Sequence, residues 1–445
     1  MTTIEKTPAG IAETPSFAEA MRTWFKIGCI NFGGPAGQIA MMHRIVVDEK
    51  KWIDEPRFLH ALNFCMLLPG PEAQKLATYI GWLLHGVRGG LASGILFVLP
   101  GALVMLGLSL LYALGRGAPL VDGALFGIKA AVLVIVIEAL IRIGKRALKT
   151  NVLLALAAAA FVGIFFLSIP FPVIVIAAAL VGWFVARSSP AQLGLKDDAI
   201  ELIAAAPDRW RQAGIASVIG LIAWWAPVAL ALLVFGPNHV LVAIGLFFSK
   251  LAVVSFGGAY ALLAYMAQEA VDKQGWLTAA EMVDGLGLAE TTPGPLIMVT
   301  QFVGYLAAFR EPEPFTPIIA GIIGAGLTTW VTFAPCFLWI FTFAPWIDRL
   351  ENARWLKGGL SALTAAVVGV IANLAVWFAL HVIFQRVSPH MVGPMKLHIP
   401  DLTSFSWQAT LLAVIAALLI FRFKWNVIAV LGAAAAGGIV LGQLA

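Results

Sequence analysis

The feature that most constrains this chain is a series of long segments without a single charged residue, including 91–114, 152–169, 171–185 and 215–235. A helix needs about 20 apolar residues to cross the hydrocarbon core of a bilayer, which is about 30 Å thick. The alternation of apolar and polar residues that marks a membrane β-barrel is absent. The sequence therefore predicts an all-α polytopic membrane protein that lies in a lipid bilayer.

The composition agrees with a membrane location and argues against several other classes of protein. Of the 445 residues, 60% are hydrophobic and 12% are charged, whereas soluble proteins carry about 25% charged residues. We attribute the net charge of +5 to basic cytoplasmic loops rather than to nucleic-acid binding. The polar residues 1–16 predict a disordered tail, and we see no cleavable signal peptide.

No enzyme signature is present in the chain. A search finds no Walker loop, His-Glu-x-x-His, Gly-x-Ser-x-Gly or Cys-x-x-Cys pattern. We therefore expect no catalytic activity, no cofactor and no metal. Energy for transport would come from an ion gradient, the membrane potential or a separate partner.

Thirteen candidate spans can be drawn, with a range of 10–13 because the segments near 70 and 294 are each broken by Pro-Gly-Pro. Those two segments are either discontinuous spanning helices or re-entrant hairpins. With thirteen spans, 17 of the 25 lysines and arginines in loops fall on the side of the N-terminus. The positive-inside rule then places the N-terminus in the cytoplasm and the C-terminus outside. The loop 43–57 conflicts with this count, since it carries four basic residues on the predicted outer side.

An internal repeat relates the two halves at an offset of 224 residues. Between 32–71 and 256–295, 12 of 40 ungapped positions are identical. The repeat predicts a tail at 1–16, a first half at 17–187, a linker with a linking helix at 188–238 and a second half at 239–445. Six spans per half plus one linking span make the halves inverted repeats, a common transporter architecture. If the Pro-Gly-Pro segments re-enter the membrane, parallel halves remain an alternative.

The repeated Pro-Gly-Pro motifs predict breaks between two helices. They are Pro69, Gly70 and Pro71 in the first half and Pro293, Gly294 and Pro295 in the second. A helix that starts after such a break presents free N–H groups and a positive dipole end, which suit an anion. A structural kink is the alternative for a single break, but two breaks at matching positions favour a binding site.

The repeated Phe-Gly-Gly motifs are the second candidate for anion binding. They are Phe32, Gly33 and Gly34 in the first half and Phe256, Gly257 and Gly258 in the second. Glycine lets the backbone approach a ligand closely, and it equally lets two helices pack closely. We keep both interpretations.

Lysines inside apolar segments are the third candidate, because a charge in the bilayer marks a pathway or a paired site. Lys26 and Lys250 occupy the same repeat position, and a symmetric pair of cations suits a dianion. The alternative is that they extend to the membrane interface. Lys75, which follows the first Pro-Gly-Pro, either binds the anion or pairs with Glu72. Lys129 is a weaker candidate, with Glu138 or Asp122 as its expected partner.

Two acids beside the Pro-Gly-Pro motifs are candidates for proton coupling. Glu72 follows Pro71, and Glu290 precedes Pro293 by three residues, with Asp284 six residues earlier. Intramembrane carboxylates carry protons in pumps and transporters. For Glu72 the alternative is stabilisation of a helix start, and for Glu290 it is an ion pair with a lysine.

The residues around these motifs resemble those of the chromate ion transporter (CHR) family. The resemblance rests on Phe-Gly-Gly-Pro-Ala-Gly-Gln at 32–38, Leu-Leu-Pro-Gly-Pro-Glu-Ala-Gln at 67–74, Gly-Trp-Leu-Thr at 275–278 and Thr-Pro-Gly-Pro at 292–295. Two halves in one chain resemble the long-chain, bidomain members. The resemblance implies export of chromate across a bacterial inner membrane, driven by the proton motive force, by halves of opposed orientation.

Other functions stay open at this stage. Sulfate is a tetrahedral dianion like chromate, so a sulfate or other oxyanion transporter is the alternative within transport. A membrane-embedded chromate reductase and a scaffold that transports nothing are the alternatives from other classes. We carry a homodimer as a hypothesis for the assembled protein and expect no nucleic-acid partner.

Overall fold

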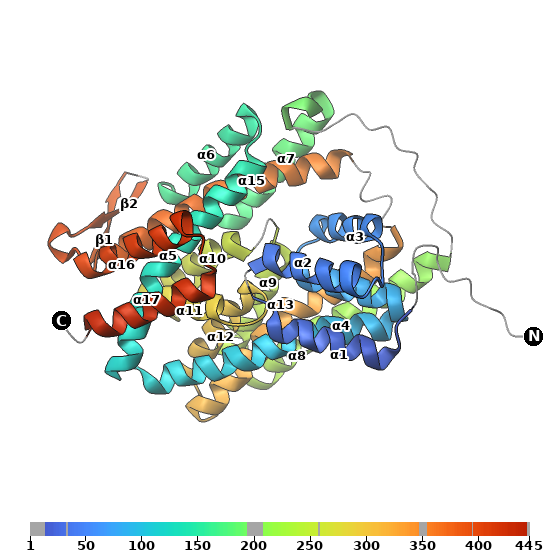
Figure 1. Ribbon diagram of the computed structural model, residues 1–445, viewed down its shortest axis with the longest axis horizontal. Helices are drawn as coiled ribbons and strands as arrows, with labels where there is room; N and C mark the ends of the chain where they lie inside the picture. The colour runs from blue at the N-terminus through green and yellow to red at the C-terminus, as the bar shows by residue number, and fades with distance from the viewer. Residues whose placement is uncertain are drawn as a thin grey trace, which may run out of the picture.

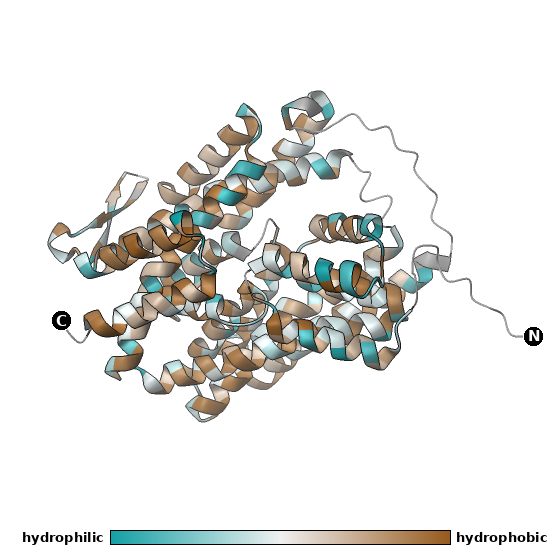
Figure 2. Ribbon diagram, in the orientation of Figure 1, coloured by the Kyte–Doolittle hydropathy of each residue, from teal (hydrophilic) through white to brown (hydrophobic). Residues whose placement is uncertain are grey.

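The computed structural model describes residues 14–32, 34–193, 208–256, 259–346, 354–393 and 395–442. Within these ranges, six helices are long and apolar enough to cross a membrane, and five shorter apolar helices accompany them. Hydrophobic residues line almost every helix (Figure 2), and many large ones are exposed, such as Leu233 and Ile222 on α8. Exposed leucine and isoleucine in such numbers match a surface that faces lipid. The chain is therefore a helical multi-pass membrane protein, as predicted.

The described elements, in chain order, are α1 (Phe17–Ile30), α2 (Gly34–His43), the π-helix η1 (Arg44–Glu49), α3 (Glu55–Leu67), α4 (Glu72–Gly115), α5 (Pro119–Ala147), α6 (Asn151–Phe165), α7 (Phe171–Ser188), α8 (Asp208–Phe235), α9 (Val240–Val253), α10 (Ala259–Ala267), the π-helix η3 (Gln268–Lys273), α11 (Ala279–Thr291), α12 (Val299–Arg310), α13 (Pro317–Phe343), α15 (Arg354–Ile383), α16 (Trp407–Ala417) with the π-helix η7 (Leu418–Arg422), and α17 (Val427–Gly442). A β-hairpin of β1 (Val387–Val392) and β2 (Met395–Pro400), which the sequence did not predict, joins α15 to α16.

The helices form two bundles, and each bundle contains helices from both halves of the chain (Figure 1). The first bundle contains α1, α4, α8, α9, α12 and α13. The second contains α5, α6, α7, α15, α16 and α17. The last helices of each half pack against the other half. Helix α17 of the second half packs against α5 of the first half, while α6 and α7 of the first half pack against α15 of the second. Helices α3, α10 and α11 make the contacts between the bundles.

The first half begins with two helical hairpins that return to the end where they start. The ammonium of Lys50, after η1, lies 2.7 Å from a carboxylate oxygen of Glu19 on α1, so the chain has turned back. Helix α3, which Asp54 caps, leads to the first Pro-Gly-Pro. Helix α4 then runs back to a kink at His85 and Gly86. The ring of His85 contacts Phe17 at the start of α1, so both hairpins open at the same end, which we call the N-terminal end.

The second half repeats this arrangement from the other end of the molecule. Thr278 caps α11 as Asp54 caps α3. The main-chain carbonyl of Trp276, before α11, accepts a hydrogen bond from Arg310 at the end of α12. Arg116, beyond the far end of α4, pairs with Glu281 in the first turn of α11. Since about 29 residues of helix, or about 43 Å, separate Arg116 from the kink in α4, these hairpins open at the end opposite the N-terminal end.

These hairpins explain where the predicted set of spans differs from the structure. The candidate spans near 30, 70, 250 and 294 are each two short helices joined at a tip, whereas the other nine candidates correspond to single helices. An apolar segment of about 20 residues has the same composition whether it forms one spanning helix or a hairpin of two short helices, so hydropathy does not distinguish them. The hairpins also remove the conflict at the loop 43–57, because the contact between Lys50 and Glu19 places this basic loop at the N-terminal end.

Small residues permit the closest contacts between the bundle helices. A Cβ atom added to Gly127 on α5 would lie 1.8 Å from the carbonyl oxygen of Ala434 on α17. We expect Gly127→Leu to lower the thermal unfolding midpoint in detergent, because overpacking costs about 1–3 kcal/mol. Gly107→Leu is the matched control, since no heavy atom lies within 4 Å of its added Cβ. Equal midpoints for the two variants would contradict the tight α5–α17 contact.

Candidate anion pathway

The tips of the hairpins from the two halves meet and exchange hydrogen bonds at equivalent positions. The N–H of Gly70 donates to the carbonyl of Ser255 at 2.8 Å, and the N–H of Gly294 donates to the carbonyl of Asn31 at 2.7 Å. Both glycines have a positive φ, 103° and 113°, in a region that residues with a side chain rarely adopt. The structure therefore brings together the Pro-Gly-Pro motifs predicted as a site, each against the segment before the Phe-Gly-Gly of the other half.

A cavity of about 20 Å³ lies between these tips. It is lined by residues of both halves, including Pro71, Glu72, Ser255 and Pro295. Such a volume holds about one water molecule. A tetrahedral oxyanion is larger, so the tips must separate before one can pass between them.

Several amide side chains near the tips lack hydrogen-bond partners. Asn31 is fully buried, and neither atom of its carboxamide bonds to a described residue. The buried Oε1 atoms of Gln74 and Gln301 likewise accept no hydrogen bond from a described residue. Gln38, in contrast, donates to the carbonyl of Gly294 at 2.6 Å. Because an unpaired buried polar group is costly, these amides mark a place where a polar ligand would gain hydrogen bonds.

A larger cavity of about 850 Å³ leads from the N-terminal end to the tips. We call it the basic vestibule. Its walls come from the second half of α5, the turn between η7 and α17, and two residues beside the tips, Phe32 and Glu290. The charged residues that line it are Arg142, Lys145, Arg146, Lys424, Glu138 and Glu290. Four positive and two negative side chains leave an excess of two positive charges, which attracts anions.

The two acids predicted for proton coupling lie in different cavities. Glu290 is only 8% exposed, lines the basic vestibule and accepts a hydrogen bond of 2.9 Å from the hydroxyl of Tyr260. Glu72 begins α4 and lines the small cavity between the tips. Each therefore lies beside a space through which an anion would pass.

The three predicted lysines differ in burial. Lys75 is fully buried, its ammonium donates to the main-chain carbonyl of Leu68, and no ion pair with a described carboxylate accompanies this bond. Lys26 and Lys250 are exposed, and the ammonium of Lys250 lies 5.7 Å from the ring centre of Tyr265. Neither exposed lysine lines the basic vestibule or the cavity between the tips.

The Phe-Gly-Gly motifs are described only in part. Phe32 lines the basic vestibule, Gly34 has a φ of 68°, and Phe256 is half-buried. Gly33, Gly257 and Gly258 lie outside the described residues.

On the α15 side of the molecule, a narrow cleft of about 40 Å³ corresponds to the basic vestibule. Asn373 and Trp377 of α15 line the cleft, as Glu138 and Arg142 of α5 line the vestibule. Both pairs are related by an offset of 235 (373 minus 138 and 377 minus 142), the same offset that relates Pro100 inside α4 to Pro335 inside α13. The vestibule is much larger than its counterpart, and we call the side of the narrow cleft the closed side.

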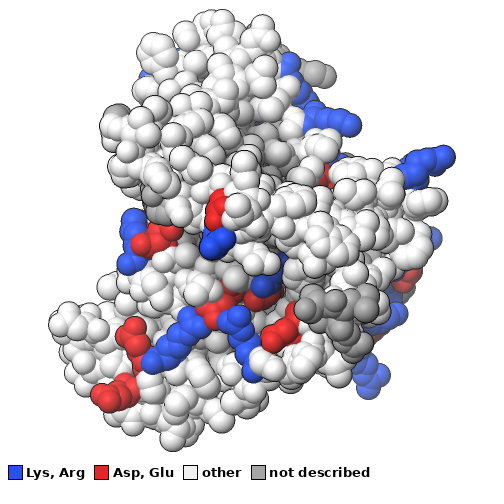
Figure 3. Space-filling model, turned by 90° about the vertical axis from the view of Figure 1, so that its left-hand side faces the viewer, with Lys and Arg blue, Asp and Glu red and all other residues white. Residues whose placement is uncertain are grey.

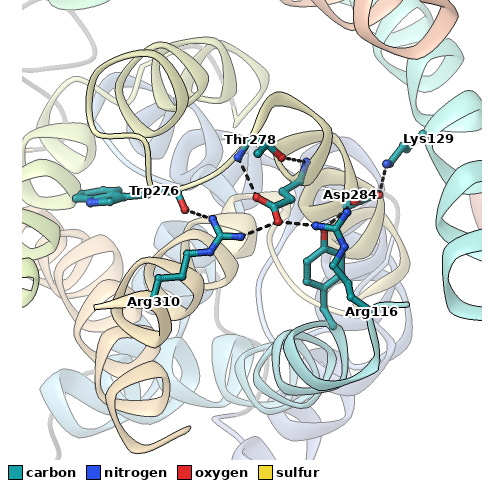
Figure 4. Close-up of polar contacts among 8 residues, drawn as sticks. Arg116, Lys129, Trp276, Thr278, Asp284 and Arg310 are labelled. Atoms are coloured by element: carbon teal, nitrogen blue, oxygen red, sulfur yellow. Dashed lines mark hydrogen bonds and ion pairs between the residues drawn. The ribbon is translucent and has the colours of Figure 1, made fainter. Parts of the chain in front are cut away.

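A network of charged side chains joins the bundles at the end opposite the N-terminal end (Figure 4). Glu281 accepts hydrogen bonds of 2.6 Å from Arg116 and from Arg310. Three residues further along α11, Asp284 lies 3.0 Å from the ammonium of Lys129 and accepts a 2.8 Å hydrogen bond from Tyr112. The partner predicted for Lys129 from the sequence was Glu138 or Asp122. Both expected partners lie on α5 itself, whereas the observed partner comes from the other half of the chain.

Other parts of the site were also missed from the sequence. Arg142, Lys145 and Arg146 were among the loop lysines and arginines counted for the positive-inside rule, and they were not predicted to contact the anion. Asn31 was passed over, although the repeat offset places it opposite Ser255, another polar residue directly before Phe-Gly-Gly. A search for polar residues at matching repeat positions would have found this pair.

Two helical bundles with a charged vestibule that ends at crossed helix breaks define a polytopic membrane transport protein. The family model of the chromate transporters matches residues 18–183 and 242–439. The chain therefore belongs to the chromate transporter family. This confirms the resemblance seen in the motifs, and it agrees with the expectation that the chain is not an enzyme.

Relatives match almost the full length of the chain. A chromate transport protein of Pseudomonas aeruginosa is 30% identical over 448 residues, covering 98% of this chain and 95% of the relative. A chromate transport protein of Cupriavidus metallidurans is 27% identical and covers 83% of this chain and 84% of the relative. An uncharacterised transporter of Methanocaldococcus jannaschii is 26% identical, with 94% and 92% covered. No solved structure matches the chain significantly.

Proposed function

We propose that this protein exports chromate across a bacterial inner membrane as a secondary transporter driven by the proton motive force. The observation that carries the proposal is the basic vestibule, which leads an anion to the crossed Pro-Gly-Pro tips. Lys75, the free main-chain N–H groups after the breaks and the Asn31 carboxamide then replace the water around the anion. Glu72 and Glu290 are the proposed proton carriers.

The proposed orientation follows from the basic residues at the N-terminal end. The vestibule arginines and lysines, the loop 43–57 and the ends of α7 and α15 that carry Arg187 and Lys357 lie at this end, which the positive-inside rule assigns to the cytoplasm. The N-terminus is then cytoplasmic and the C-terminus outside. Hairpins that open at opposite ends support inverted repeats over parallel halves, and a vestibule open to the cytoplasm suits export.

The direct test is uptake of radiolabelled chromate into inverted membrane vesicles with an imposed proton gradient. Accumulation that depends on the gradient and on the protein supports the cargo, the direction and the driving force. An excess of unlabelled sulfate distinguishes the alternative, because equal competition by sulfate indicates a general oxyanion transporter. Absence of accumulation in vesicles that hold correctly inserted protein would reject chromate export.

The vestibule arginine gives a sharper prediction. We expect Arg142→Gln to raise the KM for chromate by about 3- to 10-fold with little change in kcat, because a partly exposed cation contributes on the order of 1 kcal/mol. Lys273→Gln is the control, since Lys273 is an exposed cation on η3, outside the vestibule. The two variants are compared in the same vesicle assay at one ionic strength. An unchanged KM for Arg142→Gln would remove the vestibule from the pathway.

A further inference from the structure

The ion pair between Lys129 and Asp284 connects the two bundles at a buried position. Lys129 belongs to α5 of the second bundle, and Asp284 belongs to α11, which contacts both bundles. Asp284 is 1% exposed and the side chain of Lys129 is 23% exposed. Lys129 precedes Arg142 by 13 residues on α5, or about 20 Å along the helix, so the pair lies well away from the mouth of the basic vestibule, toward the closed end.

The surroundings of Asp284 determine what is needed to separate this pair. The charged and titratable groups around it are Lys129 from α5, Tyr112 and Arg116 from α4 and the turn after it, and Glu281 on α11 itself. On α12 the charged residue is Arg310, which binds Glu281. Helix α17, which also contacts α11, carries no titratable residue between Val427 and Gly442. Lys129 is thus the one described ammonium that forms an ion pair with Asp284.

Moving α5 away from α11 would leave the buried Asp284 carboxylate without its ammonium partner and Lys129 without its carboxylate partner. Removing one partner of a buried ion pair is strongly unfavourable, because the remaining charge has no compensation. The separation becomes favourable when the carboxylate carries a proton and the ammonium faces another anion. A proton and an oxyanion are the two species that the proposed transport cycle brings together.

We propose that Lys129 and Asp284 form a gate on the closed side of the pathway, which opens when Asp284 takes up a proton and the transported oxyanion replaces Asp284 as the partner of Lys129. The hydroxyl of Tyr112 donates a hydrogen bond to the Asp284 carboxylate and orients it in the closed state, and Figure 4 shows Lys129 beside Asp284. This gate rests on the proposed function. It couples proton uptake to anion transport, because both charges of the separated ion pair must be balanced. Opening with only a proton or only an anion leaves one unpaired charge in the interface.

On the face drawn in Figure 3, most of the surface is uncharged and the charged side chains lie in a few clusters and along one edge. The charges nearest to Asp284 belong to the protein itself, Lys129 as its ion-pair partner and Arg116 beside it.

The test compares two transport modes of the full-length protein in proteoliposomes. Wild type and Asp284→Asn are assayed for chromate accumulation driven by a proton gradient and for exchange of labelled against unlabelled chromate without a gradient. The uncharged amide removes the need for the proton. We expect Asp284→Asn to keep exchange within about threefold of wild type while gradient-driven accumulation falls at least tenfold, because proton flux through Glu72 and Glu290 is no longer tied to opening of the gate.

The charge swap Lys129→Asp with Asp284→Lys and the single variant Lys129→Met complete the set. We expect Lys129→Met to lose both transport modes, and the swap to recover more accumulation than Lys129→Met. Glu281→Gln is the control for the neighbouring network, and we expect it to remain coupled. Coupled accumulation by Asp284→Asn, or loss of its exchange in a protein that remains monodisperse, overturns the gate alone. A wild type that moves no chromate overturns the proposed function together with the gate.

Discussion

Replacing Lys75 by Met is expected to reduce chromate transport by about 10- to 100-fold while thermal stability stays equal or rises. The ammonium of Lys75 is fully buried and bonds to the main-chain carbonyl of Leu68. A hydrogen bond from a buried charge to an anion is worth about 1.5–3 kcal/mol, and each 1.4 kcal/mol is about tenfold. Methionine fills a similar volume without the cost of burying an unpaired charge. Transport rates in vesicles and unfolding midpoints in detergent measure the two effects.

The opposite directions of these effects separate binding from support of the fold. A lysine that only held the first hairpin together would lower transport and stability in parallel. Lys26→Met and Lys250→Met, made together, test the predicted pair of symmetric cations. A loss as large as that of Lys75→Met would place these exposed lysines in the pathway, whereas transport like wild type would leave Lys75 as the lysine that binds the anion at the tips. Normal transport by Lys75→Met itself would contradict the binding role.

The repeat was the most informative feature of the sequence, because it required no knowledge of the membrane topology. Pro, Gly and Trp at one offset indicated two related halves, and the crossed bonds at Gly70 and Gly294 now show why these glycines recur. The long apolar helices, such as α8 and α13, were also predictable from hydropathy alone. Both features are read directly from residue identities, so neither requires knowledge of which residues are in contact in the folded protein.

Contacts between the halves could not be predicted in the same way. Lys129 was expected to pair along α5, since neighbours on one helix are the partners that a sequence reveals, yet its partner Asp284 is 155 positions away (284 minus 129). The helical hairpins were not distinguishable from single continuous helices, because both require an apolar surface over the same length. The exchange of α17 and α7 between the halves likewise depends on small residues, such as Gly127, whose packing partners follow from tertiary structure.

The second large effect is expected from a single methyl group at the crossed tips. Gly294→Ala and Gly70→Ala should each reduce transport at least tenfold, because φ values of 113° and 103° are strained for alanine by about 1–3 kcal/mol. The added Cβ would also lie 3.3 Å from Gly101 Cα in the first case and 2.7 Å from the sulfur of Cys336 in the second.

The control for this experiment separates the tips from backbone strain elsewhere. Gly86→Ala introduces alanine at a φ of 61°, at the kink of α4, with no heavy atom within 4 Å of the new Cβ. Since alanine is strained at a φ of 61° and a ψ of −153° as well, we expect Gly86→Ala to lower stability while chromate uptake per inserted protein stays within about twofold. Chromate uptake is normalised to inserted protein for all three variants. If the tips only join helices, Gly70→Ala and Gly294→Ala will transport like Gly86→Ala; if they form the anion site, the two tip variants will fail together, because each tip donates its N–H to the opposite half.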